Sequence, residues 1–284
     1  MIENCSSTEK WGPVTDTDAE ALVRLAVPYV RWLSPKLVAL LAADNTIHQA
    51  PWQRILAQGD ILSDLYLWPG SACAYPGRRR KTGSREQAGK PAEQCLATDT
   101  SGNNLAHRVW ELLGNGQRNF VQSRPGYELV HLFPHKAAEW KKLLRLLDEK
   151  QPTTTALLPA SWRSWLETHG LPGLFTNPAN MCFVPNTFVR PTDGHSLFRQ
   201  VLWKRALTLF GSEALLPLPV AEAVAGWLNP LPAVEDLGWN PLYHGLPEKL
   251  PALLRDRSDR LTKYESIYFY PNPKPLTTKA LFTQ

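Results

Sequence analysis

Apolar residues recur at helical spacing along most of this chain, and that pattern restricts the fold more than any other feature. Between residues 16 and 33, apolar side chains follow one another every three or four positions, with a break expected at Pro28. Further helical segments are expected at residues 35–43, 51–67, 105–113, 134–150, 161–169, 194–211, 220–228 and 247–263. A chain of this kind is mainly helical.

Three short runs have the composition of strands instead. They are residues 127–130, 181–184 and 266–270. We therefore expect an α+β fold, mainly helical, with a small central β element and helical segments packed around it. No clear linker divides the chain, so we expect one domain over residues 1–284. It would comprise a helical part (1–68), a basic loop (69–102), a central core (103–211) and a proline-rich part (212–284).

The long loop holds the densest positive charge in the sequence. Five cations lie within eight residues, and no acidic residue lies between them; the next one is Glu86. The cations are Arg78, Arg79, Arg80, Lys81 and Arg85. Glycines surround the run and let the backbone approach a phosphate closely. The net charge of +5 also favours polyanionic partners. These residues are expected to contact nucleic acid, although a solvated loop is the alternative.

Nothing in the sequence predicts secretion or a membrane partner. The first residues contain no basic segment followed by an apolar stretch. The longest apolar runs, residues 37–43 and 215–225, are too short or too broken by proline to span a bilayer. The four cysteines are scattered without CxxC spacing, which argues against a disulfide framework. We therefore expect a cytoplasmic protein.

The candidate chemistry lies in two segments that contain the first two strands. Gly-rich phosphate loops, GxSxG and HExxH are absent from the sequence. The strand at residues 127–130 runs into His131, which is followed by Leu-Phe-Pro-His-Lys136, and Asn180 opens the second strand. On these residues, from Tyr127 to Asp193, the chain resembles the ββα-metal (HNH) nucleases. The resemblance covers about a quarter of the chain.

The resemblance implies a role for each matched residue. His131 would be the general base that activates water, and Asn180 would fix the loop and hold the histidine's orientation. A residue on the following helix would bind a divalent ion, Mg²⁺ or alternatively Mn²⁺. Residues 103–211 would then contain a ββα core with an inserted helix. Phosphodiester hydrolysis suits this set, because it needs a base with a pKa near neutral and a cation that offsets developing charge.

Two positions depart from the family pattern. Val130 stands where the family places an acidic or histidine ligand, and Val189 stands where the third family residue normally lies. The nearby candidates for the metal are Asn186, Asp193 and His195. Glu128 is no substitute, because alternation along a strand directs it away from His131.

Two classes of function follow from this pattern. The first is a metal-dependent DNA endonuclease, a restriction or phage-defence effector, with Lys136 and the basic loop contacting DNA. The second is a non-catalytic protein that binds nucleic acid or a protein partner through a degenerate HNH-like site. A purely structural subunit is a third reading, and it requires a buried, bonded His131 without a cleft. A homodimer is left open. Convergence of His131, Asn180 and a metal ligand would separate these readings.

Overall fold

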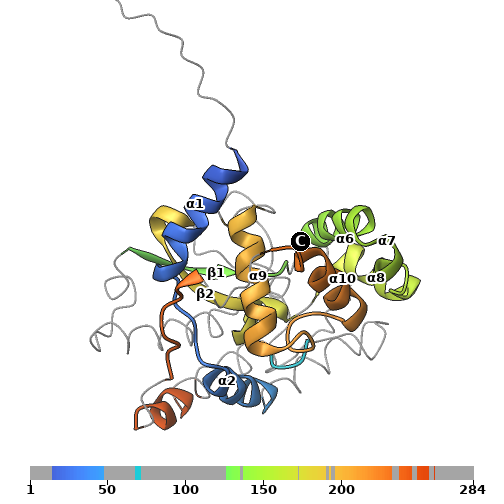
Figure 1. The fold of residues 1–284 in the computed structure, drawn as a ribbon. Helices are drawn as coiled ribbons and strands as arrows, with labels where there is room; N and C mark the ends of the chain where they lie inside the picture. The colour runs from blue at the N-terminus through green and yellow to red at the C-terminus, as the bar shows by residue number, and fades with distance from the viewer. Residues whose placement is uncertain are drawn as a thin grey trace, which may run out of the picture.

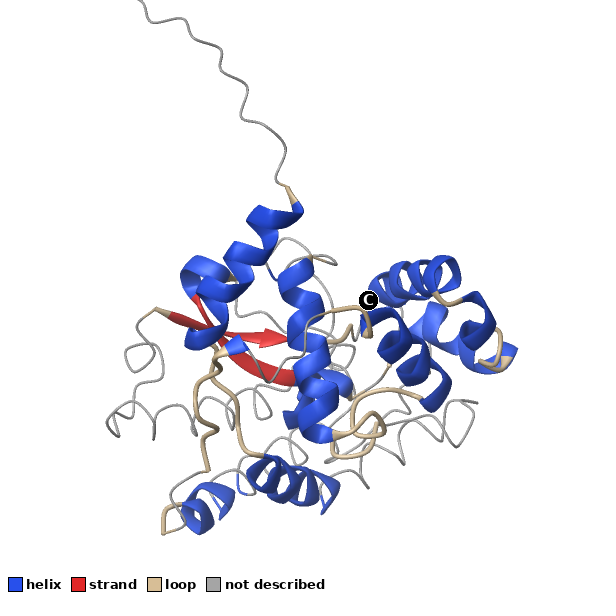
Figure 2. Cartoon of the chain, viewed as in Figure 1, coloured by secondary structure: helices blue, strands red, loops and turns tan. Residues whose placement is uncertain are grey.

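The computed structural model describes residues 15–47, 68–71, 126–134, 137–171, 173–189, 192, 196–231, 237–244, 248–255 and 259. Over these residues the chain is mainly helical, with one two-stranded antiparallel sheet (Figures 1 and 2). The expectation of a mainly helical α+β chain is thus confirmed for the described residues. The segments expected at residues 51–67, 105–113 and 266–270 lie outside them, as does the basic run at 78–85.

Local capping signals set the first two helices. Thr15 caps α1 (Asp16–Ala26) by accepting from the Asp18 backbone N–H, and the Asp18 carboxylate accepts from Thr15 in return. Pro28 lies in the turn η1 (Val27–Tyr29) that ends this helix, as expected. Ser34 Oγ accepts from the backbone N–H of Leu37 at 3.3 Å and so caps α2 (Pro35–Ile47). α2 continues beyond the expected end at residue 43.

The sheet pairs two strands that are far apart in sequence. β1 (Tyr127–His131) runs antiparallel to β2 (Met181–Pro185), with Tyr127 opposite Pro185 and His131 opposite Met181. The outer edge of β2 forms a further backbone bridge between Phe183 and Arg31. Two of the three sequence-predicted strands are therefore present, each one residue longer than expected.

The two faces of the sheet have different surroundings. Val130, Cys182 and Val184 contribute to the main hydrophobic core. Met181 and Phe183 form a separate buried cluster on the other face, together with the partly buried Tyr127 and Leu129. Strand alternation accounts for this division, because successive side chains point to opposite faces.

Helices occupy the interval between the two strands. α6 (Ala137–Lys150), α7 (Pro152–Thr155) and α8 (Ala160–His169) follow β1, and the turns η3 (Leu174–Thr176) and η4 (Pro178–Asn180) lead into β2. The turn η5 (Asn186–Phe188), α9 (Leu197–Phe210) and α10 (Leu218–Leu228) come after β2. α9 packs against α1 and α10, and α6 packs against α7 and α8 (Figure 1).

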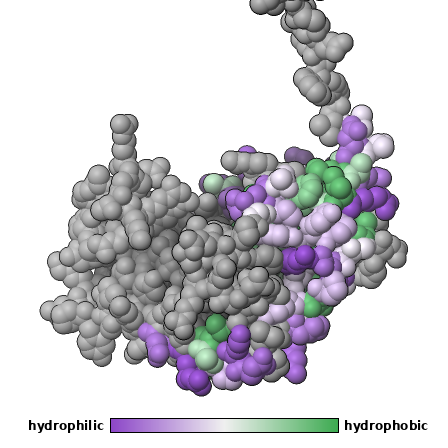
Figure 3. All heavy atoms as spheres, turned by 90° about the vertical axis from the view of Figure 1, so that its left-hand side faces the viewer, coloured by the Kyte–Doolittle hydropathy of each residue, from purple (hydrophilic) through white to green (hydrophobic). Residues whose placement is uncertain are grey.

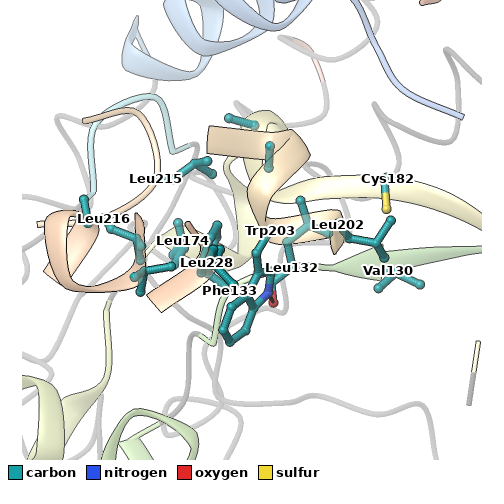
Figure 4. Close-up of a cluster of buried hydrophobic side chains, with 14 of the residues drawn as sticks. Val130, Leu132, Phe133, Leu174, Cys182, Leu202, Trp203, Leu215, Leu216 and Leu228 are labelled. Carbon is teal, nitrogen blue, oxygen red and sulfur yellow. Dashed lines mark hydrogen bonds between the residues drawn. The ribbon is translucent and has the colours of Figure 1, made fainter. Parts of the chain in front are cut away.

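The main core lies between α9, the sheet and the helices of the inserted region. Figure 4 shows Leu202 of α9 close to Val130 and Cys182 of the sheet, with Trp203 beside Leu132 and Phe133. α9 therefore packs on the Val130 face of the sheet. In the described part of the chain, none of the helices has the length and apolar character needed to cross a membrane. The described surface in Figure 3 intersperses polar and apolar residues.

Candidate functional site

His131 lies at the end of β1, where the chain leaves the sheet. Its side chain is half-buried, and the two residues that follow, Leu132 and Phe133, are fully buried. The chain thus passes directly from a partly accessible histidine into the core. Pro134 and α6 come next along the sequence. The position of His131 depends on what holds the residues after it.

Asn180 holds them through its side chain. Its Oδ1 accepts from the Phe133 N–H at 2.7 Å, and its Nδ2 donates to the Phe133 carbonyl at 3.2 Å and to the Leu174 carbonyl at 3.0 Å. Its own carbonyl accepts from the Leu132 N–H at 3.0 Å. The Asn180 side chain is 0% exposed. The expected contact between this amide and the loop backbone is present.

Two side chains of α9 bind the same loop from the other side. The Leu132 carbonyl accepts from Arg199 Nε at 3.1 Å, from Arg199 Nη2 at 2.6 Å and from Trp203 Nε1 at 2.6 Å. The Trp203 ring stacks on Phe133, with centroids 4.9 Å apart and planes inclined by 22°. Asn180, Arg199 and Trp203 together are called the loop clamp below.

The loop clamp also reaches the segment that follows β2. Arg199 Nη1 donates to the Thr192 carbonyl at 3.0 Å. Thr192 is the residue before Asp193, one of the expected metal ligands. One guanidinium therefore ties together the chain immediately after His131 and the chain immediately before Asp193.

Sequence reasoning did not single out Arg199 or Trp203. The only signal available was their spacing of four positions on a helix, which places both side chains on one face. That spacing does not indicate what the face contacts.

Cys182 lies opposite Val130 on the core side of the same sheet end. Burial raises the pKa of its thiol far above the ordinary range, and the nearby positive charge of Arg199 opposes this only in part. A neutral, fully buried thiol is a poor nucleophile and a poor metal ligand. Cys182 is therefore a packing residue.

Asn186 lies at the opposite end of the sheet from His131. Its side chain is exposed, and its backbone N–H donates to the Gly126 carbonyl at 2.7 Å, just before β1 begins. The strand between Asn180 and Asn186 spans roughly 17 Å at about 3.4 Å per residue. This register separates Asn186 from His131, and the expected role of Asn186 as a metal ligand stays a prediction.

The other expected ligands and contacts lie outside the described residues. These are Asp193 and His195 for the metal, and Arg78, Arg79, Arg80, Lys81, Arg85 and Lys136 for nucleic acid. Within the described ranges, no group of three or more His, Cys, Asp or Glu side chains could hold a metal ion. The described residues alone therefore do not make a complete metal site around His131.

Strand alternation also sets the direction of His131. Val130 faces the core and α9, so the next residue, His131, points to the other face, which it shares with its partner Met181. The ring thus leaves the strand on the side away from the helix that follows β2. Asn180 and the two α9 side chains hold the backbone of the loop and leave the imidazole on that side.

A cavity of about 460 Å³ lies elsewhere, between α2 and the end of α9. Its lining is mostly apolar and includes Val38, Ala42, Asn177, Leu209, Phe210 and Glu213. The Asn177 amide is used internally, because its Nδ2 donates to the carbonyls of Pro69 and Ala214 and its Oδ1 caps η4. Among the predicted site residues that the structure describes, His131, Asn180 and Asn186 do not line this cavity.

Comparisons with known proteins found no match for this chain among protein-family models, curated proteins or solved structures. The functional argument therefore depends on the sequence and on the geometry around His131.

Proposed function

We propose that this protein is a metal-dependent endonuclease that hydrolyses phosphodiester bonds of DNA. His131 is the general base, Asn180 is the residue that positions it, and β1, β2 and α9 form the ββα element. One observation carries the proposal: the buried Asn180 amide binds both backbone groups of Phe133 in the loop directly after His131. A general base must be held in a fixed orientation, and this contact supplies a means.

The proposal places the divalent ion, Mg²⁺ or Mn²⁺, on residues that follow β2. Asp193 is the preferred ligand and His195 the second. Arg199 supports this choice, because it binds Thr192 and Leu132 at once. The ion would offset negative charge that develops on the phosphate. A role in restriction or phage defence remains an analogy with proteins that carry decorated HNH modules.

Plasmid cleavage tests the proposal directly. Supercoiled plasmid would be incubated with the wild type, His131→Ala and His244→Ala in Mg²⁺, in Mn²⁺ and in EDTA. His244 is an exposed histidine of the described surface and is the matched control. The wild type and His244→Ala should cut in at least one metal and not in EDTA, and His131→Ala should not cut. Equal cutting by His131→Ala would overturn the assignment.

Salt dependence tests the nucleic-acid partner. If four cations of the basic loop contact phosphates, this loop alone should contribute roughly −3 to −4 to the slope of log affinity against log salt. Binding of an oligonucleotide would be measured for the wild type and for Arg78, Arg79, Arg80 and Lys81 changed together to alanine. The variant should bind more weakly with a shallower slope and an unchanged sequence preference. Identical slopes would remove the loop from the interface.

The alternative function is a non-catalytic protein that binds nucleic acid or a protein partner through a degenerate site. The direction of His131 favours it, because the ring leaves the sheet on the face opposite α9. The valines at positions 130 and 189 are also what a degenerate site would carry. Binding of the oligonucleotide without cleavage of the plasmid in either metal would support this non-catalytic alternative.

A further inference from the structure

We infer that Arg199 is a positioning residue that aligns the loop after His131 with the segment before Asp193. The inference deepens the proposed function and rests on it. The Arg199 guanidinium donates to two backbone carbonyls, that of Leu132 directly after His131 and that of Thr192 directly before Asp193.

The first step of the argument concerns the peptide groups after His131. The Leu132 N–H is bonded to Asn180, the Leu132 carbonyl to Arg199 and Trp203, and both backbone groups of Phe133 to the Asn180 side chain. Three successive peptide groups are therefore held in place. With β1 fixing the other side, the backbone of His131 is held at both ends.

The second step concerns the shape of the guanidinium. Arg199 uses Nε and Nη2 on Leu132 and Nη1 on Thr192, so two separate N–H groups grip one carbonyl while a third reaches the other. A planar, rigid fork fixes the angle between the two carbonyls as well as their separation. A lysine ammonium keeps the charge but is a single point on a flexible stem. Arg199→Lys therefore separates geometry from charge.

Trp203 holds the guanidinium itself in place. The Arg199 guanidinium carbon lies 5.4 Å from the centroid of the Trp203 ring, one helical turn further along α9. The same indole donates to Leu132 and stacks on Phe133. Phenylalanine at position 203 would keep an aromatic ring for stacking and remove only the N–H donor.

The consequence for the proposed reaction is a requirement on placement. A shift of about 1 Å in a reacting group can cost about 10²-fold in rate. Loss of the fork would let Leu132 and Thr192 move relative to one another, and His131 with them. Substrate binding by the basic loop would be unaffected.

The experiment compares Arg199→Lys and Trp203→Phe with Lys204→Met. Lys204 is the matched control, because it is a cation on the same helix whose Nζ donates to two backbone carbonyls elsewhere, those of Asn229 and Leu231. Arg199→Lys should lower kcat for plasmid cleavage by about 10²-fold with KM unchanged. Trp203→Phe should lower kcat by about tenfold. Lys204→Met should leave both constants unchanged.

The NMR signals of the His131 ring give a readout that does not require activity. The His131 ring signals are identified by their absence from the spectrum of His131→Ala. The wild type and Lys204→Met should show one matching set of these signals. Arg199→Lys should show shifted or doubled signals. Wild-type kcat and wild-type ring signals in both clamp variants would overturn the inference. Should Arg199→Lys fail to fold, Trp203→Phe decides on the same two readouts.

The two hypotheses fail in different ways. If the wild type cuts DNA in no metal, the endonuclease proposal fails and the ring signals alone decide the role of Arg199. Unchanged signals in Arg199→Lys would then reject it, and shifted signals would support it. If the wild type cuts and Arg199→Lys cuts equally well, the endonuclease proposal stands and the positioning role falls.

Discussion

The two ends of β2 each carry an asparagine, and the two residues have opposite surroundings. Asn180, before the strand, is fully buried and makes three side-chain hydrogen bonds to the backbone. Asn186, after the strand, is exposed, and its backbone N–H donates to the carbonyl of Gly126, just before β1 begins. Sequence alone gives both residues the same chemistry. Their positions along one short strand give them different tasks.

The difference shows which end of the sheet can hold a precise site. At the Asn180 end, the loop clamp joins β1, β2 and α9 through the backbone next to His131. At the Asn186 end, the described contacts include the backbone bond from Asn186 to Gly126 and the Arg31 guanidinium 5.9 Å from the centroid of the Tyr127 ring. A catalytic group needs neighbours that cannot relax, because rate depends on placement. The proposed site therefore lies at the end of the sheet whose loop is held by the buried Asn180 side chain.

The largest expected difference between the two ends of the sheet is in the rate of plasmid cleavage. Removal of a general base typically costs about 10²–10⁴-fold in rate. His131→Ala should therefore abolish plasmid cleavage with little change in melting temperature, and Asn186→Ala should cut like the wild type. Both variants would be assayed at equal protein concentration in Mg²⁺ and Mn²⁺. A comparable loss in Asn186→Ala would mean that the active site spans the sheet, contrary to the register.

Stability should divide the two asparagines next. Asn180→Ala leaves three buried backbone groups without their partner, each costing about 1–3 kcal/mol. We expect a loss of about 3 kcal/mol or more from the free energy of unfolding, together with lower activity. Asn186→Ala, an exposed substitution, should stay within about 0.5 kcal/mol of the wild type. Urea unfolding followed by tryptophan fluorescence would measure both.

Asn180→Asp sharpens this second test. The aspartate keeps an acceptor for the Phe133 N–H but has no donor for the carbonyls of Phe133 and Leu174. It should therefore be destabilised as well, and more strongly above the pKa of the carboxyl, where burial of the charge adds to the cost. Equal unfolding midpoints for all three variants and the wild type would show that the amide contacts do not hold the loop.

Most features predicted correctly from sequence depend on near neighbours; the contact of Asn180 with the loop, 47 positions away, was expected from the family resemblance instead. The helix that begins at Asp16 was located by its apolar spacing, and Pro28 breaks it by its own ring. The inserted helices followed from apolar spacing within single segments. The strands were located by composition, and the second began at Met181, the expected residue. Each of these signals is complete within a few residues.

The features that sequence did not predict depend on distant pairs. Arg199 binds a carbonyl 67 positions earlier, and Trp203 binds the same carbonyl from 71 positions away. Asn186 was a candidate metal ligand because it lies near Val189, where the third residue of the resembled family normally stands. The antiparallel register, which sets His131 against Met181, separates Asn186 from His131. Spacing in one segment carries no information on such a register.

The thiol of Cys182 offers the test with the smallest expected effect, and it asks whether water reaches the core side of the sheet at the His131 end. Burial raises the pKa of this thiol from its ordinary value of 9.0, so the folded protein keeps the proton where the unfolded chain loses it. The stability that this proton supplies is fully present below pH 9.0 and is lost as pH rises above it, by about 1.4 kcal/mol per pH unit.

Cys182→Ala removes the effect and leaves every other titrating group in common. Between pH 8.5 and pH 10, the wild type should therefore lose about 1 kcal/mol more of its unfolding free energy than Cys182→Ala does. Parallel losses in the two proteins would mean that the thiol ionises in the folded state. Water would then reach the core side of the sheet beneath His131, and the contrast between the two ends would be one of hydrogen bonding alone.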